Sequence, residues 1–201
     1  MRKVVLGVTG SIAAYKAAEL VRLFVANGDD VTVVMTPAAT EFVRPLTFQT
    51  LSRNPVFVEQ FAAPAEWKPE HISLAEAADI VVVAPATANT LAKMRFGIAD
   101  NLLTSVLLAT RAPVFVAPAM NDGMWANAAT QDNIAALRAR GVRIVGPADG
   151  PLACGTSGKG RMAAVEDVFS VCATLDSMTA SDAVVPATTD VNGKTNRQED
   201  K

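Results

Sequence analysis

The sequence contains little of several residue types, and each shortage excludes a class of protein. Among its 201 residues are one histidine and two cysteines, and the cysteines do not form a closely spaced pair. We therefore expect no disulfide framework and no metal site, and a reducing, cytoplasmic compartment. The formal net charge is only −2. This is far from the basic balance of a protein that binds nucleic acid by charge, so we expect no nucleic-acid partner.

Long apolar runs are also missing. No stretch approaches the roughly 18 consecutive apolar residues of a membrane-spanning helix, so we expect no membrane association. Arg2 and Lys3 precede a short apolar stretch, as in a signal peptide. Gly7, Gly10 and Ser11 interrupt that stretch, however, and favour a strand followed by a glycine turn.

Aliphatic residues are abundant. Half of the residues are hydrophobic, although only 5% are aromatic and 19% are charged. This composition excludes a disordered chain, and the length suits one domain with a buried core. The apolar surplus must be buried between layers or between subunits. We expect a subunit interface on the very apolar helix near residue 105, formed by Leu102, Leu103, Val106, Leu107 and Leu108.

The apolar segments alternate with helical patterns. We predict strands at residues 4–8, 31–35, 80–84, 114–117 and 142–145, and helices at 12–26, 73–78, 88–96, 101–109, 127–140 and near 165–175. The strands are almost continuously apolar, which is typical of parallel strands covered on both faces. The sequence thus predicts an α/β fold. It is a single-domain, three-layer α/β/α sandwich with a doubly wound parallel sheet, Rossmann-like or flavodoxin-like, over residues 1–175.

Two segments depart from the alternation. Residues 147–161 contain Gly150, Gly155, Gly158 and Gly160, which predicts an irregular loop of the kind that can act as a lid. Residues 176–201 are polar and have no sustained period, which predicts a disordered tail.

The candidate ligand-binding segments follow the strands, because ligands of a doubly wound sheet bind at the carboxyl ends of its strands. The turn around Ser11 and the segment 85–90 each place backbone N–H groups at a helix N-terminus, where a phosphate binds well. A tight turn and a helix cap explain the same residues without a ligand. The segment 118–125 surrounds Asn121 with methionines and a tryptophan, as in an apolar pocket with one placed amide. The glycine-rich segment carries Cys154 beside two cations that can close over an anionic substrate.

The single histidine, His71, precedes Ser73-Leu-Ala-Glu76, which has the form of a capping box. We therefore expect His71 immediately outside a helix N-terminus, where the helix dipole disfavours the imidazolium and leaves a neutral base. A histidine on a surface loop is the alternative. Cys172 lies among apolar residues of the last predicted helix and is expected in the core.

Five motifs, taken together in their order and spacing, carry a resemblance. They are Gly-Ser-Ile-Ala-Ala at 10–14, the histidine before the central strand, Pro-Ala-Thr-Ala-Asn-Thr at 85–90, the pattern PxMNxxMW at 118–125, and Ala-Cys-Gly-Thr-Ser-Gly-Lys-Gly-Arg-Met at 153–162. Over about residues 1–172 the sequence resembles the homo-oligomeric, flavin-containing cysteine decarboxylases. Thr156 and Ser157 stand where we would expect an acidic residue after the Cys-Gly pair.

The resemblance implies FMN as cofactor, held between the subunits of a homotrimer, which in this family is often assembled further into a dodecamer. The cofactor contacts that it implies are Gly10, Ser11, Ile12, Thr36, Thr87, Ala88, Asn89, Thr90 and Ala119. The catalytic residues that it implies are His71, Asn121 and Cys154. The residues expected to bind the substrate are Asn121, Met124, Lys159, Arg161 and Met162.

The implied reaction is the oxidative decarboxylation of a cysteine carboxylate. Oxidation of the thiol arm to a thioaldehyde lets the carboxylate leave as CO₂ and yields an ene-thiolate, with the flavin carrying the redox step. Family members that act on 4′-phosphopantothenoylcysteine, in coenzyme A biosynthesis, then reduce the ene-thiol. Members that act on the C-terminal cysteine of a peptide natural-product precursor release it, and need no cysteine for the reducing step. The presence of Cys154 favours the first reaction and leaves the second as the alternative. His71, Asn121 and Cys154 together argue against a non-catalytic, flavin-binding regulatory relative.

Overall fold

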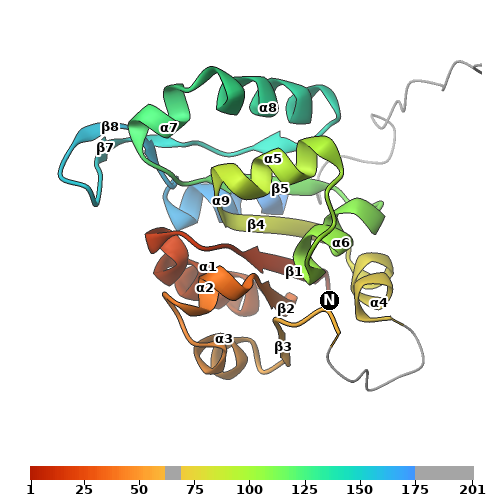
Figure 1. The fold of residues 1–201 in the computed structure, drawn as a ribbon. Coiled ribbons are helices and arrows are strands. Elements are labelled where there is room, and N and C mark those ends of the chain that lie inside the picture. The colour runs from red at the N-terminus through yellow and green to blue at the C-terminus, as the bar shows by residue number, and fades with distance from the viewer. Residues whose placement is uncertain (62–68, 175–201) are drawn as a thin grey trace, which may run out of the picture.

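The computed structural model describes residues 1–61 and 69–174. Its centre is a six-stranded parallel sheet with the order β3-β2-β1-β4-β5-β6, drawn in Figure 1. The strands are β1 (Lys3–Val8), β2 (Asp30–Met35), β3 (Val56–Phe57), β4 (Ile80–Ala86), β5 (Val114–Pro118) and β6 (Arg143–Ile144). This is the strand order of the Rossmann fold, with its switch point between β1 and β4. The predicted fold class is confirmed.

Helices cover both faces of the sheet, as Figure 1 shows. One face packs against α1 (Lys16–Ala26), α3 (Pro45–Ser52) and α9 (Val165–Ala173). The other packs against α4 (Glu70–Ala77), α5 (Ala88–Phe96), α6 (Leu102–Ala109) and α8 (Ala128–Ala139). Alternate residues of a strand face opposite layers, so Val4 and Leu6 of β1 join the first core and Val5 joins the second. Two cores and one sheet account for much of the apolar surplus.

The helix α6 shows where part of our subunit-interface prediction is wrong. Leu102, Leu103 and Val106 are at most 1% exposed, because they pack into the core beneath the sheet. Leu107 is partly buried against the same core, and only Leu108 is exposed. Most of the apolar side chains of α6 are thus buried by its own chain.

Several element boundaries differ from the prediction. The segment 12–26 begins with a 3-10 turn, η1 (Ile12–Tyr15), before α1. The helix α4 begins at Glu70 with Pro69 as its N-cap, so His71 lies inside the first turn and the predicted capping box at Ser73 is wrong. The fixed φ of proline suits a helix start, and α4 therefore begins next to Pro69, upstream of the predicted start at Ser73. The sequence patterns also missed β3, α2 (Pro37–Thr40), α3 and α7 (Asp122–Ala126).

The glycine-rich segment is regular, contrary to the predicted loop. It forms an antiparallel hairpin of β7 (Ala148–Pro151) and β8 (Ser157–Arg161), which projects at the left edge of Figure 1. The glycines permit a close approach of two backbones. A Cβ at Gly160 would lie 2.3 Å from the carbonyl oxygen of Met120, and the Met120 N–H donates to the Gly160 carbonyl at 3.0 Å.

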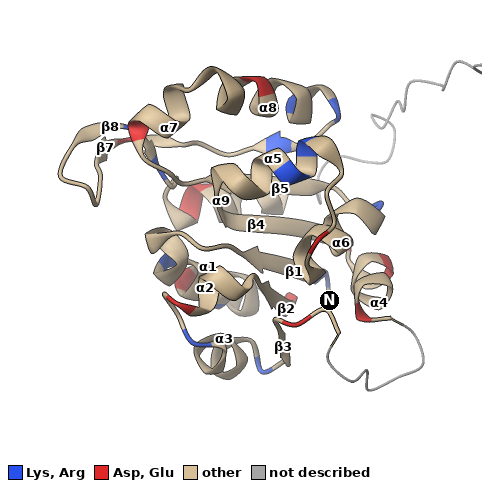
Figure 2. Cartoon of the chain, in the orientation of Figure 1, with Lys and Arg blue, Asp and Glu red and all other residues tan. Residues whose placement is uncertain are grey.

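Basic and acidic residues are interspersed over the helices and strands in Figure 2, with no large region of one sign in that view. Among residues 1–61 and 69–174, no helix is both long and apolar enough to cross a membrane. The predicted tail at 176–201 lies outside the described residues.

Candidate functional site

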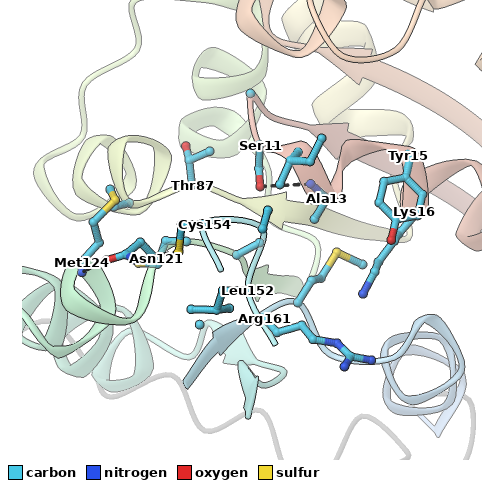
Figure 3. Close-up of a pocket in the computed structure, with 18 of the residues that line it drawn as sticks. Ser11, Ala13, Tyr15, Lys16, Thr87, Asn121, Met124, Leu152, Cys154 and Arg161 are labelled. Carbon is cyan, nitrogen blue, oxygen red and sulfur yellow. Dashed lines mark hydrogen bonds between the residues drawn. The ribbon is translucent and has the colours of Figure 1, made fainter. Parts of the chain in front are cut away.

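A cavity of about 740 Å³ opens at the carboxyl ends of β1, β4 and β5. Figure 3 shows its walls, which come from the start of η1 and α1, the start of α5, the segment around α7, and the hairpin β7–β8. The cavity brings together many predicted site residues: Gly10, Ser11, Ile12, Thr87, Ala88, Ala119, Asn121, Met124, Cys154, Arg161 and Met162. It also contains residues that we did not predict: Ala13, Tyr15, Lys16, Met120, Pro151, Leu152, Ala153 and Gly160.

One buried hydroxyl joins the two loops at the switch point of the sheet. The Thr9 hydroxyl donates to the Pro85 carbonyl at 2.7 Å and accepts from the Thr87 N–H at 3.1 Å. Thr9 is 1% exposed. Nearby, a Cβ at Gly10 would lie 2.5 Å from that of Ala38 in α2, so any side chain there would push the turn after β1 away from α2. The role of Thr9 could not be predicted from the sequence, because a hydroxyl that bonds to a distant backbone segment leaves no spacing pattern.

Two hydroxyls in this wall cap short helices. The Ser11 hydroxyl accepts from the Ala13 N–H at 3.3 Å, and the Thr87 hydroxyl accepts from the Thr90 N–H at 3.3 Å. Both caps leave further backbone N–H groups at the helix starts, which is the arrangement that binds anions. Ser11 and Thr87 therefore combine the capping role with a position in the cavity wall.

Three predicted cofactor residues do not line the cavity. Thr90 is 3% exposed and its hydroxyl contacts that of Thr87 at 3.1 Å, so it supports the wall from behind. Asn89 is exposed on α5. Thr36 has a buried hydroxyl with no hydrogen-bond partner among the described residues. A buried unpaired hydroxyl is unfavourable, so Thr36 marks a place where a polar ligand atom would be stabilising.

The opposite wall is built around Asn121, which caps α7. Its side-chain oxygen accepts from the Gly123 N–H at 2.9 Å and the Met124 N–H at 3.4 Å. Its Nδ2 donates to Asp122 Oδ1 at 2.8 Å and to Cys154 Sγ at 3.4 Å. The amide thereby joins α7 to the tip of the hairpin, and two residues that are far apart in the sequence meet in the cavity.

The two cysteines differ sharply. Cys154 is exposed at the hairpin tip, and the pKa of its thiol is lowered because the Thr156 hydroxyl, the Thr156 N–H and the Asn121 amide can donate to the thiolate. Cys172 is buried in α9, and burial raises the pKa of its thiol to about 12. Reactivity follows the thiolate, so Cys154 is the chemically competent cysteine and Cys172 a core residue, as predicted.

Two cations face the same cavity. Arg161 extends from β8 and Lys16 from the start of α1, as Figure 3 shows. Burial and the neighbouring Arg161 lower the pKa of Lys16, against an opposing effect of Glu166. An anion placed between the two cations would be favoured. Lys159, which we predicted together with Arg161, is exposed opposite Asp149 in the hairpin and does not line the cavity.

His71 lies apart from the cavity of its own chain. It is half-buried in the first turn of α4, which packs against α6. In Figure 1, α4 lies at the opposite end of the sheet from the hairpin β7–β8. The structure of one chain therefore unites Asn121 with Cys154 but leaves His71 outside. Among the described residues, no group of three or more His, Cys, Asp or Glu side chains is placed to hold a metal ion.

The architecture and the motifs agree with a known family, whose model, described as Flavoprotein, matches residues 1–175. The chain belongs to the Flavoprotein family. The resemblance found in the sequence is confirmed. The flavoprotein is 46% identical over 169 residues to the coenzyme A biosynthesis bifunctional protein CoaBC of Haemophilus influenzae, a match covering 84% of this chain and 42% of that protein. The CoaBC protein of Escherichia coli is 48% identical over 161 residues, covering 80% of this chain and 40% of that protein. The flavoprotein thus spans about two fifths of the length of these relatives.

Solved structures give the same answer. A cysteine-to-serine mutant of PPC decarboxylase, complexed with pantothenoylaminoethenethiol, matches the flavoprotein with a TM-score of 0.80 at 31% identity, covering 88% of this chain and 99% of that one. The FMN binding protein AtHal3 matches with a TM-score of 0.77 at 32% identity, covering 88% and 98%. The FMN-dependent cysteine decarboxylase SpaF matches with a TM-score of 0.73 at 28% identity, covering 87% and 98%.

Proposed function

We propose that this flavoprotein is an FMN-dependent carboxy-lyase that converts 4′-phosphopantothenoylcysteine to 4′-phosphopantetheine. The observation that carries the proposal is the hydrogen bond between Asn121 and Cys154 in a cavity that also holds Lys16 and Arg161. The first pair can orient a carboxylate and deliver a proton, and the second pair can hold a phosphate. The CoaBC relatives and the PPC decarboxylase support the same substrate class.

FMN is the cofactor, and the described residues fit it. The helix starts at Ser11 and Thr87 suit its phosphate, the unpaired Thr36 hydroxyl suits a polar atom, and apolar walls suit its ring. When bound, FMN supplies the two-electron oxidation of the substrate thiol arm and later returns the electrons. Gly10 allows the turn after β1 to lie close to Ala38 of α2.

The residues of the chain then bind the substrate and manage its protons. Asn121 orients the carboxylate that leaves as CO₂, and the apolar side chains of Met124, Leu152 and Met162 keep water from it. Cys154 holds the proton that the carbon of the ene-thiol takes up when it is reduced. The PPC decarboxylase whose cysteine is replaced by serine is complexed with an ene-thiol, which supports assigning the reducing step to Cys154.

His71 completes the site from a second copy of the chain. It lies outside its own cavity on α4, and the proposed reaction needs a base near the substrate. A homotrimer, assembled further into a dodecamer, places His71 of one subunit at the cavity of the next and holds FMN between them. The enzyme acts in the cytoplasm.

Mass spectrometry of the yellow, FMN-loaded protein tests the function. We expect 4′-phosphopantothenoylcysteine to lose the mass of CO₂, and a peptide ending in cysteine to remain unchanged. Release of CO₂ together with two hydrogens from the peptide would instead establish peptidyl-cysteine decarboxylation, which the likeness to SpaF favours as the second candidate. No loss from either substrate would overturn the decarboxylase assignment and leave a flavin-binding regulatory protein.

Lys16→Met tests the phosphate site. A charge-assisted hydrogen bond to phosphate is lost, so KM for the phosphorylated substrate should rise roughly tenfold, while KM for the dephosphorylated analogue should not change. Steady-state kinetics with both substrates measure the difference. Lys3→Met, an exposed lysine at the amino end of β1, is the matched control. An equal rise with both substrates would assign Lys16 to the shape of the pocket.

A further inference from the structure

Asp122 belongs to a closed ring of hydrogen bonds that the proposed reaction does not use. It is the first residue of α7, and its Oδ1 accepts from Asn121 Nδ2 at 2.8 Å and from the Thr156 hydroxyl at 3.4 Å. That hydroxyl lies 3.2 Å from Cys154 Sγ. Asn121 Nδ2 closes the ring on the same sulfur at 3.4 Å.

The number of hydrogens in the ring decides which group donates in the contact between Cys154 and Thr156. An ionised carboxylate only accepts hydrogen bonds, and a hydroxyl has one hydrogen to donate. When Thr156 gives that hydrogen to Asp122, its oxygen can only accept, so the Cys154 S–H is the donor in their 3.2 Å contact. When the thiol loses its proton, the thiolate and the Asp122 carboxylate compete for the same hydrogen.

We propose that Asp122 is a positioning residue that opposes the ionisation of Cys154 by occupying the hydroxyl hydrogen of Thr156. The inference rests on the proposed function, in which Cys154 delivers a proton. The hairpin packs closely on Asp122, because a Cβ added at Gly158 would lie only 2.9 Å from that of Asp122.

The charged groups around the hairpin come from several elements. Lys16 on α1 and Arg161 on β8 line the cavity together with Cys154. Lys159 on β8 adds a third cation, while Asp149 on β7 faces it across the hairpin. Asp122 is the carboxylate that reaches the ring around the sulfur from α7.

The pH dependence of Cys154 alkylation by iodoacetamide tests the proposal on the FMN-loaded protein without substrate. Cys172 is buried and does not react, so the rate reports Cys154 alone. Asp122→Asn removes a negative charge and leaves a neutral amide oxygen, which is a weaker competitor for the Thr156 hydrogen, so the pKa of the thiol falls. We expect the profile to move to lower pH and the rate at neutral pH to rise about threefold, because the gain in thiolate exceeds the loss in nucleophilicity. Asp149→Asn removes the same charge from the same hairpin outside the ring and should leave the profile in place.

Thr156→Val separates the ring from simple charge, and it changes only an exposed tip residue. The single variant loses a donor to the thiolate and should be alkylated more slowly than the wild type. In the Thr156→Val variant, the further substitution Asp122→Asn should accelerate alkylation less than half as much as it does in the wild type. An unchanged profile in Asp122→Asn, or an equal acceleration with and without Thr156, would overturn the proposal. Because no substrate is used, these outcomes are independent of whether the protein releases CO₂.

Discussion

His71→Asn should abolish CO₂ release while the protein keeps its yellow colour. The substitution removes the only histidine of the chain and with it the proposed base, and general acid–base catalysis is worth about a hundredfold or more in rate. The flavin should stay bound, because the substitution leaves the helix starts at Ser11 and Thr87 unchanged. Flavin absorbance of the purified variant and CO₂ release per bound flavin measure the two effects. Near-normal turnover would remove His71 from the mechanism.

Subunit mixing identifies which chain supplies His71. An Asn121→Asp variant should also be inactive, because its amide no longer binds the substrate carboxylate. Co-expression of the two inactive variants produces mixed oligomers, in which an intact His71 from one subunit meets an intact Asn121 of another. We expect part of the activity to return. If activity does not return in verified mixed oligomers, His71 does not act across the subunit boundary.

Cys154→Ser should still release CO₂ but should change the product. A serine hydroxyl is a much weaker acid than a thiol, so the proton for the reducing step is missing and the ene-thiol accumulates. The product should then be lighter than 4′-phosphopantetheine by two hydrogens, and the bound flavin should stay reduced without air. Mass spectrometry and anaerobic flavin absorbance detect these two effects.

Ser157→Ala provides the matched control for Cys154→Ser. Ser157 is likewise exposed at the hairpin, but it does not line the cavity. We expect normal product and a reoxidised flavin from this variant. Formation of the ordinary thiol product at the normal rate by Cys154→Ser would show that another group donates the proton.

The sequence predicted the sheet well because its central strands are buried on both faces. Every residue of β4 is buried, and such a strand leaves an unbroken apolar run that is easy to find. The strand β3 has only two residues, Val56 and Phe57, which is too short for any period to appear. The glycines of the hairpin predict a loop, although Gly160 is needed for the close approach of β8 to the Met120 backbone. A glycine in a strand can mark a close approach of another backbone as well as irregular structure.

The site was predicted less completely, and the reason is physical. Motifs identified Asn121 and Cys154 separately, but their contact depends on the hairpin folding back onto α7. Lys16 has the sequence context of a solvent-exposed helix residue, and only the tertiary structure shows that it faces Arg161 across a cavity. The start of α4 was misplaced because Ser73 and Glu76 have the form of a cap whose role Pro69 takes upstream.

The Asn121 amide has a consequence for how a substrate enters. Its two Nδ2 hydrogens are both engaged before any substrate arrives, one by Asp122 and the other by Cys154. An incoming carboxylate must therefore displace one of the protein's own partners. If it displaces the sulfur, the thiol is freed from the amide at the moment when the substrate is anchored. The enzyme thus carries an internal competitor for its own carboxylate site, and a ligand that binds Asn121 without a carboxylate has to be a better acceptor than a thiol.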